Sequence, residues 1–355
     1  MSPTQSNVEK IESYLKPFPR VLLANTPTPL EKLPRLSSKI KGPTFFAKRD
    51  DMTGFASGGN KARQLEFSFG EACSIGADIV LITGAVQSNY IRSAAAAAAK
   101  LGMACHVQLE DRVAEMDSTY HATGNVLLNK IFGATSSTFH LGENEAAADA
   151  NLENIAEKYR KKGHSPYLLT LSADTKPLGS LGYMICAAEI LDQINQKKQT
   201  IDAIILASGS AATHVGTLLG LRLLGSNIPV YGICVRRDKE QQSQRVKRII
   251  RSAEGLINCG EIVSNNDIKC HDEWLSPGYG KTNKSVYEAL MLAGQLEGMI
   301  LDPVYTAKSF AGAIGLSRQG LFTNKENILY IHTGGMPALF AYEKDLTNNI
   351  PSKDN

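Results

Sequence analysis

Residues 58–67 place a lysine directly behind two glycines and an asparagine, at the start of a pattern that favours a helix. The glycines permit a tight turn with an open backbone. Lys61 then falls in the first helical turn, where the helix dipole disfavours a cation and can lower the amine's pKa below its usual value of about 10.4. A neutral amine is the form that makes a Schiff base with an aldehyde. The same local sequence also fits an ordinary solvated lysine.

Two further turns combine small, hydroxyl-bearing residues with a helix start behind an apolar run. The turn at 84–89 contains Ser88 and Asn89, and the turn at 208–213 contains three hydroxyls. Backbone N–H groups at such helix starts bind anions. The first turn suits a carboxylate or simple N-capping, and the second suits a phosphate or a close-packed turn. The second lacks both the P-loop lysine and G-x-G-x-x-G spacing, which argues against a nucleotide or a nicotinamide dehydrogenase.

Two loop tyrosines complete the set of candidate reactive groups. Tyr279 lies between two glycines, and Tyr305 follows an Asp-Pro-Val segment. A phenol in a cleft can act as an acid, a base or a hydrogen-bond donor, although packing or a surface position fits each ring taken singly. Together, one amine, two anion sites and loop phenols suit a phosphate-bearing aldehyde cofactor and a carboxylate substrate.

Apolar runs alternate with helix patterns, which indicates parallel α/β sheets with ligand sites at the carboxyl ends of the strands. We expect strands at 77–83, 104–109, 201–207, 229–235 and 328–332, and helices at 8–16, 90–101 and 215–224. These form two βαβ units about 120 residues apart. We therefore predict an α/β fold of two lobes with a cleft between them, and we expect the polar segment 141–163 on the surface of the first lobe.

Composition excludes several other classes. The chain has 355 residues, 43% of them hydrophobic, and a formal net charge of +3, so nothing favours nucleic acid or an anionic membrane as a partner. No apolar run reaches the roughly 18 residues of a membrane span, and residues 1–7 lack the pattern of a secretory signal. The six scattered cysteines predict free thiols in a reducing cytoplasm, and the seven histidines show no metal-ligand spacing.

The chain resembles the family of D-cysteine desulfhydrases and 1-aminocyclopropane-1-carboxylate deaminases, which are pyridoxal-phosphate enzymes of the tryptophan-synthase-β-like fold. The likeness covers nearly the whole chain. Its most specific pieces are Lys48-Arg49-Asp50-Asp51, Gly58-Gly59-Asn60-Lys61, Gln87-Ser88-Asn89, Pro277-Gly278-Tyr279-Gly280, Leu301-Asp302-Pro303-Val304-Tyr305 and His332-Thr333-Gly334-Gly335. Their order along the chain matches the family.

The resemblance implies a role for each candidate residue. Lys61 looks like the Schiff-base lysine and proton carrier, and Asn60 like the partner of the hydroxyl on the cofactor's ring. Ser88, Asn89 and Tyr90 look like the substrate-carboxylate loop, with Ser88 assisting the proton transfer. The other implied site residues are the phosphate-binding turn of Gly209, Ser210, Ala211, Ala212 and Thr213, the active-site phenols Tyr279 and Tyr305, and Thr306, which would face the pyridine nitrogen. No metal is implied.

Two positions distinguish the activities within this family. The deaminases resembled here have Glu after the second tyrosine and Leu after the late histidine, whereas this chain has Thr306 and Thr333. A carboxylate keeps the ring nitrogen protonated and the ring strongly electron-withdrawing, while a hydroxyl leaves it neutral. Expelling a thiolate needs less carbanion stabilisation than opening a cyclopropane ring, which favours β-elimination.

The chain also departs from the family pattern. Gln64 stands where a second lysine is usual, Tyr90 where His or Gln is usual, and Ala212 where Gly is common, and residues 172–176 replace a Gly/Ser-rich loop. These changes bear on cofactor affinity and substrate choice.

We therefore predict a cytoplasmic, homodimeric pyridoxal 5'-phosphate lyase that converts D-cysteine or a related small amino acid to pyruvate, ammonia and sulfide. The alternatives are a 1-aminocyclopropane-1-carboxylate deaminase and a non-catalytic phosphate-ligand binding protein. The expected domains are 1–61 with 172–355, which would bind the cofactor, and a smaller 62–171.

Overall fold

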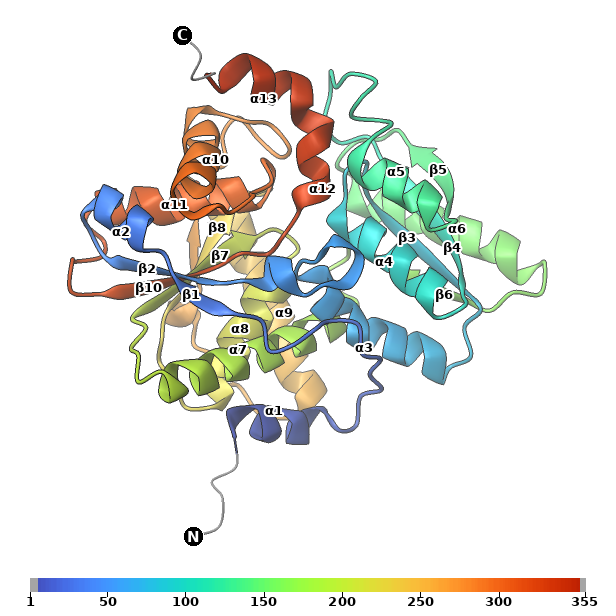
Figure 1. The fold of residues 1–355 in the computed structure, drawn as a ribbon. Helices are drawn as coiled ribbons and strands as arrows, with labels where there is room; N and C mark the ends of the chain where they lie inside the picture. The colour runs from blue at the N-terminus through green and yellow to red at the C-terminus, as the bar shows by residue number, and fades with distance from the viewer. Residues whose placement is uncertain (1–5, 352–355) are drawn as a thin grey trace.

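The computed structural model of the protein describes residues 6–351 and contains two separate sheets (Figure 1). The larger sheet has the order β1 (Leu30–Lys32), β2 (Thr44–Lys48), β10 (Asn327–Ile331), β7 (Ala203–Ser208), β8 (Val230–Cys234) and β9 (Lys269–His271). The smaller has the order β5 (Thr135–Phe139), β4 (Ala104–Glu110), β3 (Ile79–Ala85) and β6 (Pro166–Leu169). Only β1 pairs antiparallel, so the predicted mostly parallel α/β architecture is confirmed.

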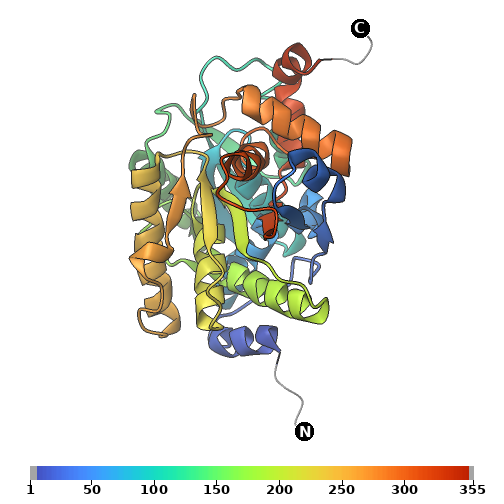
Figure 2. The same cartoon turned by 90° about the vertical axis from the view of Figure 1, so that its left-hand side faces the viewer.

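The helices connect and cover these strands (Figure 2). They are α1 (Asn7–Leu15), α2 (Pro34–Ile40), α3 (Lys61–Ser74), α4 (Asn89–Lys100), α5 (Gly124–Ile131), α6 (Glu145–Arg160), α7 (Leu178–Gln196), α8 (Ala212–Leu223), α9 (Lys239–Ile257), α10 (Lys284–Glu297), α11 (Thr306–Arg318), α12 (Met336–Leu339) and α13 (Glu343–Asn349). None of the helices within residues 6–351 is both long and apolar enough to cross a membrane.

Side chains along the strands of the large sheet alternate between its two faces, and each face is covered by a hydrophobic core. In β10, Leu329 and Ile331 pack in the core that contains α7, α8 and α9, whereas Ile328 and Tyr330 pack in the core that contains α10 and α11. Successive side chains of a strand point to opposite faces, so a sheet covered on both faces reads as a continuous apolar run. This covering explains why the apolar runs in the sequence identified these strands.

The small sheet is covered in the same way. Helices α3 and α4 pack on one face, where the alanine-rich stretch of α4 allows close approach, and α6 packs on the other through Leu152 and Ala156, with Ala148 buried one turn before them. These three residues recur every four positions, and most of the remaining side chains of α6 are at least partly exposed. The polar segment 141–163 therefore lies on the surface of this lobe, as predicted.

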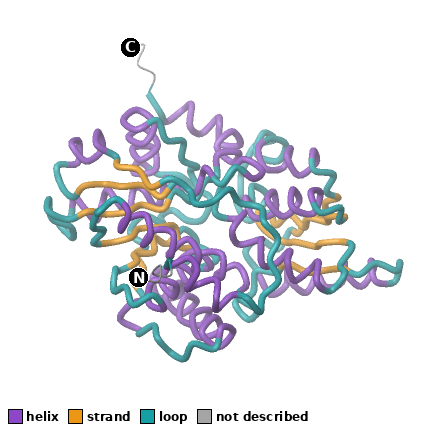
Figure 3. The backbone as a smooth tube through the Cα atoms, turned by 60° about the horizontal axis from the view of Figure 1, so that its bottom comes forward, coloured by secondary structure: helices purple, strands orange, loops and turns teal. Residues whose placement is uncertain are grey.

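All the predicted strands and helices are present, with ends that differ by up to three residues. The strands of the small sheet fall within residues 62–171 and form a group apart from the others (Figure 3). The predicted boundary at 61/62 falls at the start of α3, which packs against both α7 and α4. The domain limits therefore stay a prediction, and residues 1–5 and 352–355 of the predicted large domain lie outside the described residues.

A buried ionic network fixes the start of α3. The guanidinium of Arg63 contacts Asp50 (Nε–Oδ2 2.9 Å) and Glu189 (Nη1–Oε1 2.8 Å), and Lys48 adds a contact to Glu189 at 3.0 Å. Tyr183 also donates to Asp50 at 2.6 Å. Burial alone would raise the pKa of Asp50, but Arg63 and Lys48 bring it below its ordinary value. The network joins β2, α3 and α7.

The Gly58-Gly59 turn is tight, as predicted, and leaves no room for a side chain at Gly58. Gly58 has φ +72°, and a Cβ there would lie 1.8 Å from the carbonyl oxygen of Asp51. Gly59 has φ +108° and donates to the carbonyl of Asp50 at 3.0 Å. Because only glycine fits both the conformation and the close approach, this turn is what delivers Lys61 to the first turn of α3.

Close packing of α7 on α8 generates the first testable prediction. A Cβ at Gly216 of α8 would lie 2.1 Å from the carbonyl oxygen of Ser180 in α7. We expect Gly216→Ala to force these helices apart and to destabilise the protein by roughly 1 to 3 kcal/mol. The measurement is the thermal melting temperature. Gly255→Ala in α9 is the control, because no atom lies within 4 Å of a Cβ there, and it should be neutral or slightly stabilising. Equal melting of both variants would contradict this packing.

Candidate active site

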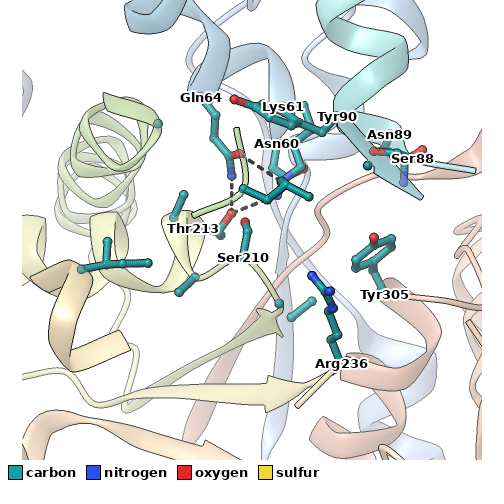
Figure 4. Close-up of a pocket in the computed structure, with 18 of the residues that line it drawn as sticks. Asn60, Lys61, Gln64, Ser88, Asn89, Tyr90, Ser210, Thr213, Arg236 and Tyr305 are labelled. Atoms are coloured by element: carbon teal, nitrogen blue, oxygen red, sulfur yellow. Dashed lines mark hydrogen bonds between the residues drawn. The ribbon is translucent and has the colours of Figure 1, made fainter. Parts of the chain in front are cut away.

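One cavity brings together the predicted site residues from both lobes (Figure 4). It is lined by Asn60, Lys61, Ser88, Asn89, Tyr90, Gly209, Ser210, Ala211, Ala212, Thr213, Tyr279 and Tyr305. The strands β3 and β7 end at this cavity, and α4 and α8 begin there. The arrangement therefore follows the rule that ligands bind at the carboxyl ends of parallel strands.

The amine of Lys61 is enclosed without a carboxylate partner. Its Nζ donates to Oε1 of Gln64 at 3.0 Å and lies 5.4 Å from the centroid of the Tyr90 ring. Within residues 6–351 Lys61 forms no salt bridge. Burial lowers the pKa of Lys61 to about 8. Roughly a tenth of the amine is then neutral at pH 7, which an ordinary solvated lysine would not achieve.

The turn 209–213 has the features of an anion site. The first intrahelical bond of α8 runs from the N–H of Val215 to the carbonyl of Ala211, so the N–H groups before it precede the helical ladder. The hydroxyl oxygen of Thr213 accepts from the amides of Asn60 and Gln64, each at 2.9 Å, which leaves its own proton available to a ligand.

The left-handed residue of this turn is Ala211, one position before Ala212, the residue that departs from the family pattern. Ala211 has φ +80°, in the left-handed region, whereas Ala212 is the first residue of α8. A non-glycine residue in that region costs about 1 kcal/mol. The backbone strain in this turn therefore lies at Ala211, whereas Ala212, where glycine is common in the family, has an ordinary helical conformation.

The loop 88–90 begins α4 and presents hydroxyl and amide groups. The hydroxyl of Ser88 accepts from the N–H of Ile91 at 3.2 Å, so Ser88 is an N-cap. Oδ1 of Asn89 accepts from Asn125 at 3.0 Å and from Arg92 at 3.3 Å. Burial raises the pKa of Tyr90 to about 12, so its phenol is protonated at neutral pH. Capping leaves the hydroxyl proton of Ser88 free to bind an anion.

Tyr279 and Tyr305 form a pair in the cavity. Their hydroxyl oxygens are 2.5 Å apart. Burial raises the pKa of Tyr279 although Arg112 opposes the shift, and burial together with Tyr279 raises the pKa of Tyr305 well above its usual value. Both phenols are therefore protonated at neutral pH; one proton forms the bond between them, and the other is available to a ligand.

The role predicted for Thr306 stays a prediction, and the structure shows its hydroxyl bonded to a neighbouring carboxylate. Thr306 is fully buried, does not line the cavity, and donates its hydroxyl to Oδ1 of Asp302 at 2.7 Å. Asp302 in turn accepts from the N–H groups of Val304, Tyr305 and Thr306, so this hydroxyl helps to close the first turn of α11. Thr333, by contrast, does line the cavity.

Several cavity residues were not predicted as site residues. They are Gln64, Arg112, Glu145, Arg236 and Arg245. Gln64 departs from the family pattern, and its amide bridges Lys61 and Thr213. Arg112 and Arg236 each lie two residues beyond the end of a parallel strand, β4 and β8. That position was a usable signal, since side chains just past the carboxyl end of a strand face the ligand site.

Known proteins resemble this chain over most of its length. The model of the family described as "Pyridoxal-phosphate dependent enzyme" matches residues 21–334. The D-cysteine desulfhydrases of Salmonella typhi and Salmonella newport (strain SL254) are each 39% identical over 329 residues, which cover 93% of this chain and 98% of theirs.

Solved structures agree in fold. An ACC deaminase homologue superposes with a TM-score of 0.86 at 35% identity, covering 96% of this chain and 99% of its own. The diaminopropionate ammonia lyase of Escherichia coli has a TM-score of 0.67 at 13% identity, covering 97% and 91%, which shows the fold alone. The cavity, its free amine and these matches agree: the chain belongs to the family of pyridoxal-phosphate-dependent enzymes.

Proposed function

We propose that this enzyme is a lyase that eliminates the β-substituent of D-cysteine or a closely related small amino acid. D-cysteine would yield pyruvate, ammonia and sulfide. The observation that carries the proposal is the partly neutral amine of Lys61 in one cavity with two anion-binding helix starts. The relatives named D-cysteine desulfhydrase support the choice of substrate.

The donors around the cavity fit pyridoxal phosphate. The turn 209–213 offers backbone N–H groups and the Thr213 hydroxyl to a phosphate, and Lys61 offers an amine to an aldehyde. Asn60 lies beside both, where it would serve the ring hydroxyl. When bound, the cofactor supplies an electron-accepting ring that stabilises negative charge at the substrate's Cα.

The substrate's position follows from the remaining groups. Ser88, Asn89 and Tyr90 at the start of α4 would bind its carboxylate. Lys61 in its neutral form would accept the Cα proton, assisted by the Ser88 hydroxyl. The hydrogen-bonded pair of Tyr279 and Tyr305 would donate its remaining phenol proton as the Cβ–S bond breaks and its electron pair passes to sulfur. Water then converts the released unsaturated amine to pyruvate and ammonia.

The deaminase alternative is supported by the resemblance to the ACC deaminase homologue. Against it stand the hydroxyl residues Thr306 and Thr333, where the deaminase pattern has Glu and Leu. Thr306 reaches Asp302 rather than the cavity, so Thr333 is the better candidate for the hydroxyl near the ring nitrogen. The non-catalytic alternative predicts cofactor binding without product.

The homodimer and the cytoplasmic location remain part of this proposal and rest on the family resemblance and the free thiols. Light scattering on the purified protein tests the dimer.

The second prediction concerns the reaction. Purified protein should show visible cofactor absorbance and release sulfide and pyruvate in equal amounts from D-cysteine, faster than it consumes 1-aminocyclopropane-1-carboxylate. Lys61→Ala should lose the covalently held cofactor and at least about 1000-fold of the activity. Lys39→Ala, which removes an exposed lysine of α2, is the control. The elimination proposal fails if the cyclopropane substrate is preferred, and coloured protein without product favours the binding alternative.

The third prediction tests the cause of the lowered pKa of Lys61. A folded-state pKa of about 8 against an ordinary 10.5 means that the unfolded chain binds more protons between these pH values. Enclosing the ammonium therefore lowers the free energy of unfolding. This loss is complete below pH 8 and disappears as the pH rises to 10.5.

Cofactor-free Lys61→Met should accordingly be more stable than cofactor-free wild type at pH 7, by up to about 3 kcal/mol. The advantage should shrink as the pH approaches 10.5, as measured by urea unfolding of both proteins at each pH. An advantage that is the same at every pH would refute a lowered pKa and indicate a packing effect.

A further inference from the structure

Two arginines approach the tyrosine pair from opposite lobes. Arg112 follows β4 of the small sheet, and Arg236 follows β8 of the large sheet. The Cζ atom of Arg236 lies 6.0 Å from the centroid of the Tyr279 ring, and its guanidinium points into the cavity beside Tyr305 (Figure 4). Arg112 acts electrostatically on both phenols. Both guanidiniums therefore border the part of the cavity that contains Tyr279 and Tyr305.

Each of these guanidiniums keeps an unused nitrogen. Arg112 donates through Nε and Nη2 to one oxygen of Glu110, at 2.9 and 2.7 Å. Arg236 donates through Nε to Glu143 at 3.2 Å and through Nη1 to Glu145. No acceptor among residues 6–351 receives a bond from Nη1 of Arg112 or Nη2 of Arg236. The side chains are only 4% and 9% exposed, so these donors face the cavity rather than bulk solvent.

Two neighbouring arginines have a different task. Arg237 donates to the carbonyl of Gly209 at 3.3 Å, and Arg245 donates to the carbonyl of Ser210 at 3.2 Å. Their hydrogen bonds hold the turn 209–213 in place, and both share the carboxylate of Glu145 with Arg236. Glu145 is shared among three arginines, and Glu143 adds a second carboxylate contact to Nε of Arg236, so neither carboxylate occupies Nη2.

We propose that Arg112 and Arg236 form a second anion subsite, which selects amino acids whose β-substituent itself carries a sulfo or phospho group. The subsite deepens the proposed elimination and rests on it. Ser88 and its neighbours would bind the α-carboxylate, and the two arginines would bind the anionic β-substituent beside the tyrosines. Planar guanidiniums with paired donors match the oxygens of such a group. The thiol of cysteine is mostly uncharged at pH 7 and cannot fill these donors.

Serine O-sulfate illustrates the reaction for this class. Lys61 accepts the Cα proton, and the Cβ–O bond breaks with its electron pair passing to oxygen, so sulfate departs. One water then converts the unsaturated amine to pyruvate and ammonium. The net products are sulfate, pyruvate, ammonium and one proton, and no oxidant or reductant is consumed.

Binding to the cofactor-loaded enzyme provides a test that does not depend on turnover. The probes are 3-sulfopropanoate and butanoate, which share a carboxylate, lack an amine and differ in the charge of the far end. Calorimetry should show 3-sulfopropanoate binding about 10- to 100-fold more tightly, the range expected for charge-assisted hydrogen bonds. Equal binding of the two probes would overturn the subsite.

Matched variants locate the effect. Arg236→Gln should abolish most of the preference, and Glu145 would keep Arg237 and Arg245 as partners. Arg112→Gln is the second variant, in case the first fails to fold, and retained cofactor absorbance reports folding for both. Arg160→Gln, which makes the same charge change on the exposed face of α6, should leave the preference intact. A preference that survives in both cavity variants places the anion elsewhere and refutes the proposal.

Turnover separates this inference from the function on which it rests. Both enantiomers of serine O-sulfate and of β-chloroalanine, whose substituent is uncharged, are assayed for pyruvate. A kcat/KM at least tenfold higher for serine O-sulfate, lost in Arg236→Gln, supports the subsite. Turnover of β-chloroalanine without that preference overturns the subsite alone and leaves the guanidiniums to assist a leaving thiolate. No pyruvate from any of these substrates or from D-cysteine overturns the proposed elimination itself.

Discussion

The ion pairs of Arg63 with Asp50 and Glu189 are the interactions on which the geometry of the candidate active site depends. They lie almost wholly out of solvent, and Lys48 completes a set of two cations and two carboxylates. Breaking one member of such a set would leave a buried charge uncompensated, which costs about 3 to 5 kcal/mol. Because Arg63 lies two residues after Lys61, the network sets where α3 begins and where the reactive amine points.

Two enclosed lysines near the start of α3 have partners of different charge. Lys48 and Lys61 are both largely enclosed, but Lys48 contacts the carboxylate of Glu189 whereas Lys61 contacts the uncharged amide of Gln64. Desolvation without an opposite charge lowers a lysine pKa, and pairing opposes that shift. Gln64 thus lets the amine lose its proton while its amide nitrogen supports Thr213 in the anion-binding turn.

The two lobes contribute complementary halves of the cavity. The small sheet ends at Ser88 and Arg112, and the large sheet ends at the turn 209–213 and Arg236. Each half supplies the start of one helix, α4 or α8, and one guanidinium. Glu145 of α6 joins the lobes through its contacts with Arg236, Arg237 and Arg245. A ligand with anionic groups at separate ends therefore meets fixed donors from both sides, which favours orientation over simple attraction.

The sequence by itself determined the secondary-structure elements and predicted most of the residues that line the candidate site. Apolar runs identified the strands because sheets covered on both faces leave no polar face, and the Gly58-Gly59 turn identified Lys61 because close backbone approach excludes other residues. The family motifs supplied the remaining roles, and twelve of the thirteen predicted residues line one cavity.

Only the tertiary structure decided what each side chain faces. It turned the hydroxyl of Thr306 toward Asp302, placed the left-handed residue at Ala211, made Gln64 a bridge, and brought Arg112 and Arg236 to one pair of tyrosines. The physical reason is that spacing along the chain reports secondary structure and its faces. The orientation of the Thr306 hydroxyl and the φ of Ala211 are set by the packing around each turn, and the contact of Gln64 with Thr213, 149 positions away, depends on how the two lobes are held together.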